Sequence, residues 1–152
     1  TLARRMLSDQ ADAEDVVQDA FLKLWTHAAR WQPGRAKFET WLYRVTLNAC
    51  YDRLRRRRTA GLEAAMGVSD GAPHPDAGLE SRRMVTEIEA ALTALPERQK
   101  AAILLCHFKD RSNIEAAEIL GLGVEALESL LARGRRTLRT RLSHLRDALG
   151  EV

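Results

Sequence analysis

The sequence lacks the patterns that mark membrane spans, metal sites and catalytic centres. No apolar run approaches the roughly 20 residues that cross a bilayer, and the first residues, TLARRMLSDQ, contain no apolar signal-peptide segment. The two cysteines, Cys50 and Cys106, share no C-x-x-C spacing, so we expect buried, reduced thiols. The four histidines are scattered, and no catalytic triad, phosphate loop or metal-ligand pattern occurs. The sequence therefore predicts no enzyme, no cofactor and no metal.

Positive charge is absent from one segment in the middle of the chain. The net charge is only +3, but residues 1–58 carry twelve Lys/Arg against seven Asp/Glu, and residues 81–152 carry twelve against ten. Residues 59–80 carry no basic residue, four acidic ones, four glycines and two prolines. This composition is typical of a linker, with one short helical turn expected at 62–66. We predict an all-α chain of two small helical domains, 1–58 and 81–152, joined by a flexible acidic linker at 59–80.

Helical periodicity runs through the first block. The stretch DAEDVVQDAFLKLWTHAARW predicts a helix with Asp12 as its N-cap. Its expected apolar stripe consists of Val16, Val17, Ala20, Phe21, Leu24, Trp25 and Ala28. After a Pro33-Gly34 turn, FETWLYRVTLNACYDRLRRRR predicts a second helix. Its expected core face consists of Phe38, Trp41, Leu42, Val45 and Ala49.

The second block contains a helix-turn-helix pattern in AAEILGLGVEALESLLARGRR, residues 116–136. Ala117 is the small residue where two helices touch, and Gly121, four residues later, supplies the turn. The expected apolar anchors are Ile119, Leu120, Leu122, Val124, Leu127 and Leu130. Gly123 is a weaker cap than Ser or Asp, and Gly134 should cost about 1 kcal/mol relative to Ala.

The same apolar positions would occur in an ordinary corner between two packed helices that does not bind DNA. The outward face of the second helix therefore decides between a structural corner and a DNA-binding motif. That face is polar and ends in arginines, which suit base edges and phosphates in a DNA groove. The residues we expect to contact DNA are Glu125, Glu128, Ser129, Arg133, Arg136 and Arg139.

The two blocks together resemble the extracytoplasmic-function (ECF, group IV) sigma factors of the sigma-70 family. DAEDVVQDAFLKLW followed by FETWLYRVTLNACYDRLRRRR is similar to sigma region 2, and LPERQKAAILLCHF with the helix-turn-helix is similar to region 4. The resemblance covers residues 1–142 and is short of about one region 2 helix at its start. We therefore expect native residues to precede Thr1.

The resemblance implies an alternative sigma factor that binds core RNA polymerase and directs transcription from promoters with −10 and −35 elements. It implies contact with the β′ clamp helices through the polar face of the first helix: Asp12, Glu14, Asp15, Gln18 and Asp19. It implies −10 contact through the second helix and the residue before it: Lys37, Arg44, Asn48, Tyr51, Arg55 and Arg56. The 124–141 helix would bind the −35 element.

The resemblance also implies further partners and a place in the cell. These are the polymerase β flap and an anti-sigma factor, with the chain in the bacterial cytoplasm or held by that factor at the inner membrane. No small-molecule substrate is expected. The alternative is a stand-alone helix-turn-helix regulator that binds DNA without polymerase and uses its first block to sense a ligand or dimerise.

Overall fold

The computed structural model describes residues 1–30, 37–61 and 78–150, and side chains through residue 147. The described residues form helices and no strands, which confirms the all-α prediction. The N-terminal half contains α1 (Leu2–Leu7), α2 (Gln10–His27), the short 3-10 helix η1 (Ala28–Arg30) and α3 (Phe38–Thr59). The predicted Pro33-Gly34 turn and most of the predicted linker lie outside the described residues.

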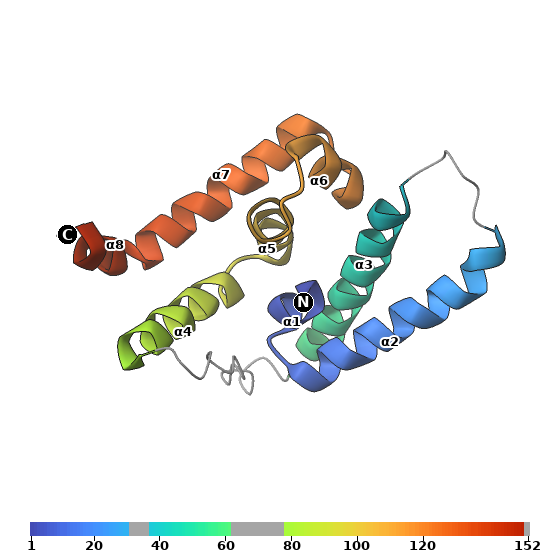
Figure 1. The fold of residues 1–152 in the computed structure, drawn as a ribbon, viewed down its shortest axis with the longest axis horizontal. Coiled ribbons are helices and arrows are strands. Elements are labelled where there is room, and N and C mark those ends of the chain that lie inside the picture. Colours follow the sequence, from blue (N-terminus) through green and yellow to red (C-terminus); the bar gives the residue numbers. More distant parts are fainter. Residues whose placement is uncertain (31–36, 62–77, 151–152) are drawn as a thin grey trace.

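The C-terminal half is built from shorter helices. It contains α4 (Leu79–Thr93), α5 (Glu97–Ile103), the π-helix η3 (Leu104–Phe108), α6 (Asn113–Leu120), α7 (Val124–Arg141) and α8 (Ser143–Gly150). In Figure 1, α2 and α3 lie side by side at one end of the molecule, α7 runs along the opposite edge, and α1 and α5 lie between them. None of the described helices is long and apolar enough to cross a bilayer.

One cluster of buried side chains runs through both halves. Met6 of α1 and Leu47 of α3 belong to the same cluster as Leu104 of η3 and Leu127 of α7. The helices of the two halves therefore share a core, although each half is a continuous stretch of sequence. The domain boundaries at 58/59 and 80/81 stay predictions.

The start of α2 differs from the prediction. Asp9, not Asp12, is the N-cap, and its Oδ1 atom accepts a hydrogen bond from the Asp12 backbone nitrogen at 2.9 Å. Both residues are good capping types, and the helix uses the one that directly follows the left-handed Ser8 at the end of α1 (φ 54°). Asp12 thereby lies in the first turn, and its side chain is free to meet α3.

The predicted apolar faces of α2 and α3 are only partly buried. On α2, Val16 and Ala20 are buried, but Phe21 is 63% exposed and Trp25 is 85% exposed, because the second half of α2 extends beyond the core. On α3, Phe38 is exposed and Trp41, Leu42, Val45 and Ala49 are partly buried, whereas the fully buried residues, Leu47 and Cys50, lie outside the predicted face. The reason is that α3 packs against α1 and α2 on one side and against α6 on another, so a single stripe does not describe it.

The helix-turn-helix prediction is confirmed in its geometry. Ala117 is buried, and Gly121 ends α6 in the left-handed conformation (φ 66°) that glycine adopts without strain. Of the predicted anchors, Ile119 and Leu127 are buried, but Val124 at the start of α7 is exposed and was wrongly assigned to the core. The expected helix over 124–141 is present as α7, and a separate α8 follows it.

Candidate polymerase and promoter interfaces

The polar face of α2 divides into an exposed part and an inward-facing residue. Glu14, Asp15, Gln18 and Asp19 are exposed, as a surface that meets another protein requires. Asp12, which the sequence grouped with them, instead points toward α3. The exposed carboxylates leave α2 with an acidic face next to the uncovered Phe21 and Trp25.

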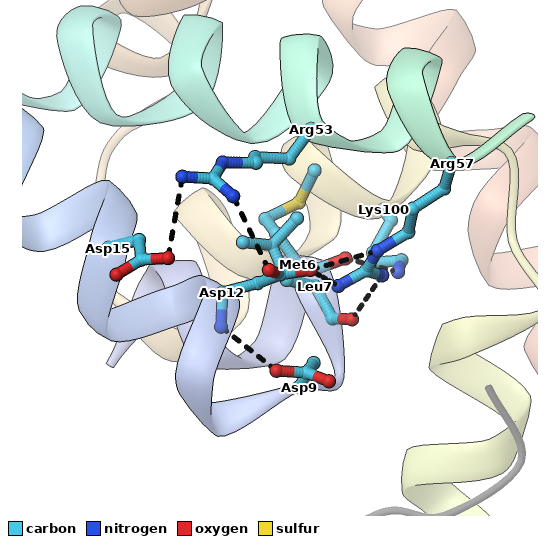
Figure 2. A network of polar contacts seen from close by, with 8 residues as sticks. All are labelled: Met6, Leu7, Asp9, Asp12, Asp15, Arg53, Arg57 and Lys100. Atoms are coloured by element: carbon cyan, nitrogen blue, oxygen red, sulfur yellow. Dashed lines mark hydrogen bonds and ion pairs between the residues drawn. The ribbon is translucent and has the colours of Figure 1, made fainter. Parts of the chain in front are cut away.

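Asp12 is the centre of a network that joins α1, α2 and α3 (Figure 2). Its Oδ1 atom lies 3.5 Å from Arg53 Nη1, and its Oδ2 atom pairs with the Arg57 guanidinium. Arg57 also donates from Nη1 to the Leu7 carbonyl oxygen at 2.8 Å, and Arg53 reaches Asp15 Oδ2 at 3.5 Å. Asp12 and Arg57 therefore hold α1, α2 and α3 together. The sequence alone did not predict this structural role.

The four consecutive arginines at the end of α3, the RRRR run at residues 55–58, point in different directions. Arg55 and Arg56 are exposed, with Arg55 pairing to Asp52 one turn earlier at 2.6 Å. Arg57 faces the Asp12 network, and Arg58 forms an ion pair with Glu97 of α5. Only part of the RRRR run is thus presented to solvent as a phosphate-binding surface.

Three of the predicted −10 residues lie where α3 meets the helix-turn-helix. Arg44 donates from Nε to the Glu118 carbonyl oxygen of α6 at 3.1 Å. Arg44, Asn48 and Tyr51 line a cavity of about 120 Å³ together with Leu122 and Leu130. Lys37, at the start of α3, is exposed and lies apart from this cavity.

The Tyr51 hydroxyl is buried in this contact between the halves. It has no hydrogen-bond partner among the described residues. Burial raises the pKa of Tyr51, and the positive charge of Arg98 opposes that shift.

The outward face of α7 is uncovered. Its predicted base- and phosphate-contacting residues are all exposed, and none of their side chains makes a hydrogen bond or ion pair within the described part of the chain: Glu125, Glu128, Ser129, Arg133, Arg136 and Arg139. The opposite face is anchored by Leu127 and Leu131. Arg135, between the two faces, donates from Nε to His107 Nε2 at 3.1 Å. The helix therefore presents a polar surface on a rigid support, as a groove-binding helix does.

Gly134 allows α7 to pack closely on α5. The glycine is buried, and a Cβ atom at this position would lie 3.1 Å from Ile103 Cγ1. The sequence indicated only a loss of helix propensity here. The close approach of Ile103 supplies the reason for a glycine in the middle of the helix.

Two titratable groups are buried between the halves: Lys100, which the sequence did not single out, and Cys50, which was expected to be a buried thiol. Lys100 donates from Nζ to the Met6 carbonyl oxygen at 3.0 Å, and burial lowers the pKa of this amine to about 8. Burial raises the pKa of the neighbouring Cys50 thiol to about 12. Both cysteines are free thiols. The described residues contain no group of His, Cys, Asp and Glu arranged to hold a metal ion.

Comparison with known proteins agrees with the two-part architecture. The family model for sigma-70 region 2 matches residues 1–60, and the model for sigma-70 region 4 matches residues 86–138. The chain is 32% identical over 156 residues to the ECF RNA polymerase sigma factor SigW of Bacillus subtilis, covering 95% of this chain and 82% of SigW. It is 35% identical over 146 residues to SigE of Mycolicibacterium smegmatis, covering 93% of this chain but 56% of SigE.

Solved structures show the same fold. The sigma factor RpoE of Bartonella quintana, solved with the anti-sigma factor NepR, superimposes with a TM-score of 0.74 at 27% identity, covering 93% of this chain and 88% of RpoE. CnrH, solved with the cytosolic domain of CnrY, gives a TM-score of 0.68 at 31% identity, covering 94% of this chain and 79% of CnrH. With region 2 and region 4 in the same order and two relatives matched along most of their length, the chain belongs to the ECF sigma factors of the sigma-70 family.

Proposed function

We propose that the chain binds core RNA polymerase and directs it to promoters through their −10 and −35 elements. The observation that carries the proposal is the joint presence of two features in one chain. One is a helix-turn-helix whose recognition helix α7 has an uncovered polar face. The other is a region 2 unit whose α2 helix displays an acidic, aromatic surface.

The polymerase contact is assigned to α2. Glu14, Asp15, Gln18 and Asp19 supply negative charge, and the exposed Phe21, Leu22 and Trp25 supply apolar area beside it. Aromatic anchors next to complementary charge are typical of protein interfaces that bind tightly. A basic, amphipathic helix pair such as the β′ clamp fits this surface. Asp12 contributes indirectly, by fixing α2 against α3.

Promoter contact is divided between α3 and α7. Lys37, Arg44, Arg55 and Arg56 would neutralise phosphates of the −10 strand, while Asn48 and Tyr51 offer a base-edge partner and a stacking surface. On α7, the glutamates and Arg133 would meet base edges of the −35 duplex, and Arg136 and Arg139 its backbone. Two weak contacts on one chain reinforce each other when the polymerase fixes their separation.

Regulation by an anti-sigma factor is part of the proposal. The structurally similar RpoE and CnrH were each solved with such a partner or a segment of it. A protein that covers α2 or α3 would withhold the chain from polymerase. We place its action in the bacterial cytoplasm, as a binding factor rather than an enzyme.

The proposal is tested by mixing the chain with purified bacterial core RNA polymerase. We expect co-elution in gel filtration, and transcripts from a library of upstream regions whose start sites share −35 and −10 elements. Asp15→Arg with Asp19→Arg should abolish co-elution, whereas Arg53→Ala, which removes the Arg53 ion pairs to Asp12 and Asp15 but leaves both carboxylates in place, should not. Tight binding to DNA without core, and no effect on start-site choice, would instead indicate a stand-alone regulator.

A further inference from the structure

The charges of α7 fall into two separate blocks. The first two turns carry two acidic residues, Glu125 and Glu128, and no basic one. Basic residues of the helix begin at Arg133 and continue to Arg141, with no acidic residue between them. The outward face of α7 therefore offers carboxylate acceptors near its beginning and guanidinium donors toward its end.

Neither glutamate has a partner within the described part of the chain. Both side chains are exposed, and neither makes a hydrogen bond or an ion pair with a described residue. A Lys or Arg one turn away stabilises a glutamate on a solvated helix. Within four positions of Glu125 or Glu128, in either direction, the sequence contains no basic residue. Both carboxylates are therefore available to a ligand.

The helix dipole explains the position of only one of the two glutamates. Glu125 lies in the first turn of α7, where negative charge is favourable. Glu128 lies one turn further along, where this effect has fallen off, and Glu125 repels it slightly. The stability of the helix thus gives no reason for a carboxylate at residue 128.

The base edges of the DNA major groove offer few partners to a carboxylate. Phosphates repel its negative charge, so a carboxylate in the groove needs a hydrogen-bond donor that offsets this repulsion. The donors on the base edges are the amino groups of cytosine N4 and adenine N6. Adenine N6 lies between its own N7 acceptor and thymine O4, whereas cytosine has no acceptor on its major-groove edge. Cytosine is therefore the base that suits a carboxylate best.

We propose that Glu125 and Glu128 confine the chain to −35 elements with cytosine opposite the first two turns of α7. Each carboxylate accepts a hydrogen bond from a cytosine N4 amino group, and Arg133 donates to O6 and N7 of a guanine. Glu128 and Arg133 are five residues apart, about 7.5 Å along the helix, which corresponds to about two base-pair steps. The inferred element therefore contains a cytosine and, about two base pairs from it, a guanine. The inference rests on the proposed function, because it takes α7 as the helix that binds the −35 element.

The glutamates discriminate by rejecting other sequences rather than by adding affinity. Opposite thymine or guanine, a carboxylate faces O4, or O6 and N7, so two acceptors meet without a donor between them. Opposite cytosine, the N4 hydrogen bond offsets the repulsion by the phosphates. The arginines of α7 supply affinity for every sequence through phosphate contacts. Loss of a carboxylate should therefore strengthen binding to unrelated DNA and weaken the choice of base at one position.

Charge-neutral variants of the chain, assembled with core polymerase, test the proposal. Glu125→Gln and Glu128→Gln keep the length of each side chain, and the amide suits adenine instead of cytosine. Glu118→Gln is the matched control, because it removes an exposed carboxylate from α6, outside the proposed DNA face. Each holoenzyme transcribes a library of promoters randomised over the −35 element, and sequencing of the transcribed promoters gives the preferred base at every position.

We expect the wild type to prefer cytosine by about tenfold at the positions that the glutamates contact. Each Gln variant of α7 should lose that preference at one position, accept adenine there, and keep the guanine preference that depends on Arg133. Glu128→Arg should change the preferred base at its position from cytosine to guanine. Glu118→Gln should match the wild type. In fluorescence anisotropy without core, the two α7 Gln variants should bind a duplex with a scrambled −35 element about two- to fivefold more tightly than the wild type.

Three results would overturn the proposal while leaving the proposed function intact. The first is a −35 element, selected by the wild type, that contains no preferred cytosine. The second is a cytosine preference that survives in both α7 Gln variants or that Glu118→Gln reduces equally. The third is a loss of preference in the α7 variants that is uniform over the whole element, because the glutamates would then be structural. If the wild type does not bind core, or its promoters share no −35 element, the proposed function fails and the inference with it.

Discussion

Lys100 of α5 donates a hydrogen bond to the backbone carbonyl oxygen of Met6 in α1, across the contact between the two halves. The lysine is only 4% exposed, and the titratable groups that act on its charge are Cys50 and Arg57. Burial lowers the pKa of Lys100 to about 8 and raises that of Cys50 to about 12. Folding therefore disfavours the charged form of both groups, and their effects on stability have opposite signs above neutral pH.

The pH dependence of stability follows from these two shifts. Between pH 8 and 9, Lys100 is protonated in the unfolded chain but neutral in the folded one, so the free energy of unfolding rises, by up to about 1.4 kcal/mol per pH unit. Above pH 9, the Cys50 thiol ionises in the unfolded chain but not in the folded one, which opposes the rise. Above about pH 10, the raised pKa of Tyr51 adds to the decline. Urea denaturation from pH 7.5 to 11 should show a maximum near pH 9–10.

Variants separate the two contributions. Lys100→Met should remove the rise between pH 8 and 9, and Cys50→Ala should delay the decline above pH 9 while costing stability at every pH through the cavity it leaves. A curve for Lys100→Met that still rises with the wild-type slope would mean that another group carries the effect.

Asp12 and Asp15 lie one turn apart on α2 but should differ in their contribution to stability. Asp12 pairs with two arginines, one of which is largely buried, whereas Asp15 reaches only Arg53 from an exposed position. Asp12→Ala leaves Arg57 without its carboxylate and should lower the free energy of unfolding by about 2 kcal/mol, between the values for exposed and buried pairs. Asp15→Ala should change it by less than about 0.5 kcal/mol. Equal losses in urea denaturation would contradict the structural role of Asp12.

The fold was largely predictable because helical periodicity and turn residues are local signals. Gly121 marked the end of α6, and the Ala117 and Leu127 positions followed from the helix-turn-helix pattern. What the sequence did not provide was the packing between the halves. Leu47 was missed as a core residue, and Cys50 was expected to be buried but was not placed on the predicted face of its helix, because α3 is covered on more than one side, which no single-helix pattern contains.

The proposed sites also contain features that local sequence patterns predict and features that depend on contacts between distant residues. The α7 residues were identifiable because an exposed helix face is visible from the phase of its own sequence. The pairing of Asp12 with α3 could not be predicted because its partners, Arg53 and Arg57, are some 40 residues away in sequence. The burial of Lys100 was not predicted because a lysine is ordinarily exposed. The sequence around Lys100 also gives no sign that its amine donates a hydrogen bond to the distant Met6 carbonyl oxygen.

Gly134 should be more favourable in α7 than alanine despite its lower helix propensity. The Cβ of Gly134→Ala would lie 3.1 Å from Ile103 Cγ1, and the resulting overpacking of about 1–3 kcal/mol exceeds the gain of about 1 kcal/mol in propensity. We expect a net loss of about 1 kcal/mol. In an Ile103→Ala background the same substitution should be neutral or stabilising, which a double-mutant cycle by urea denaturation measures. Stabilisation in the wild-type background would show that α5 and α7 can move apart without cost.

Arg133 should contribute to promoter recognition without contributing to polymerase binding. It lies on the exposed face of α7, and its side chain makes no hydrogen bond or ion pair among the described residues. Arg133→Ala should therefore leave the fold and core co-elution unchanged, while transcription that depends on the −35 element falls by about tenfold, the effect of losing one base-edge contact. Arg135→Ala, on the same helix but bonded to His107, is the matched control and should retain −35 selectivity. A loss of core co-elution in Arg133→Ala equal to the loss of transcription would make Arg133 structural and remove the recognition-helix assignment from this face of α7.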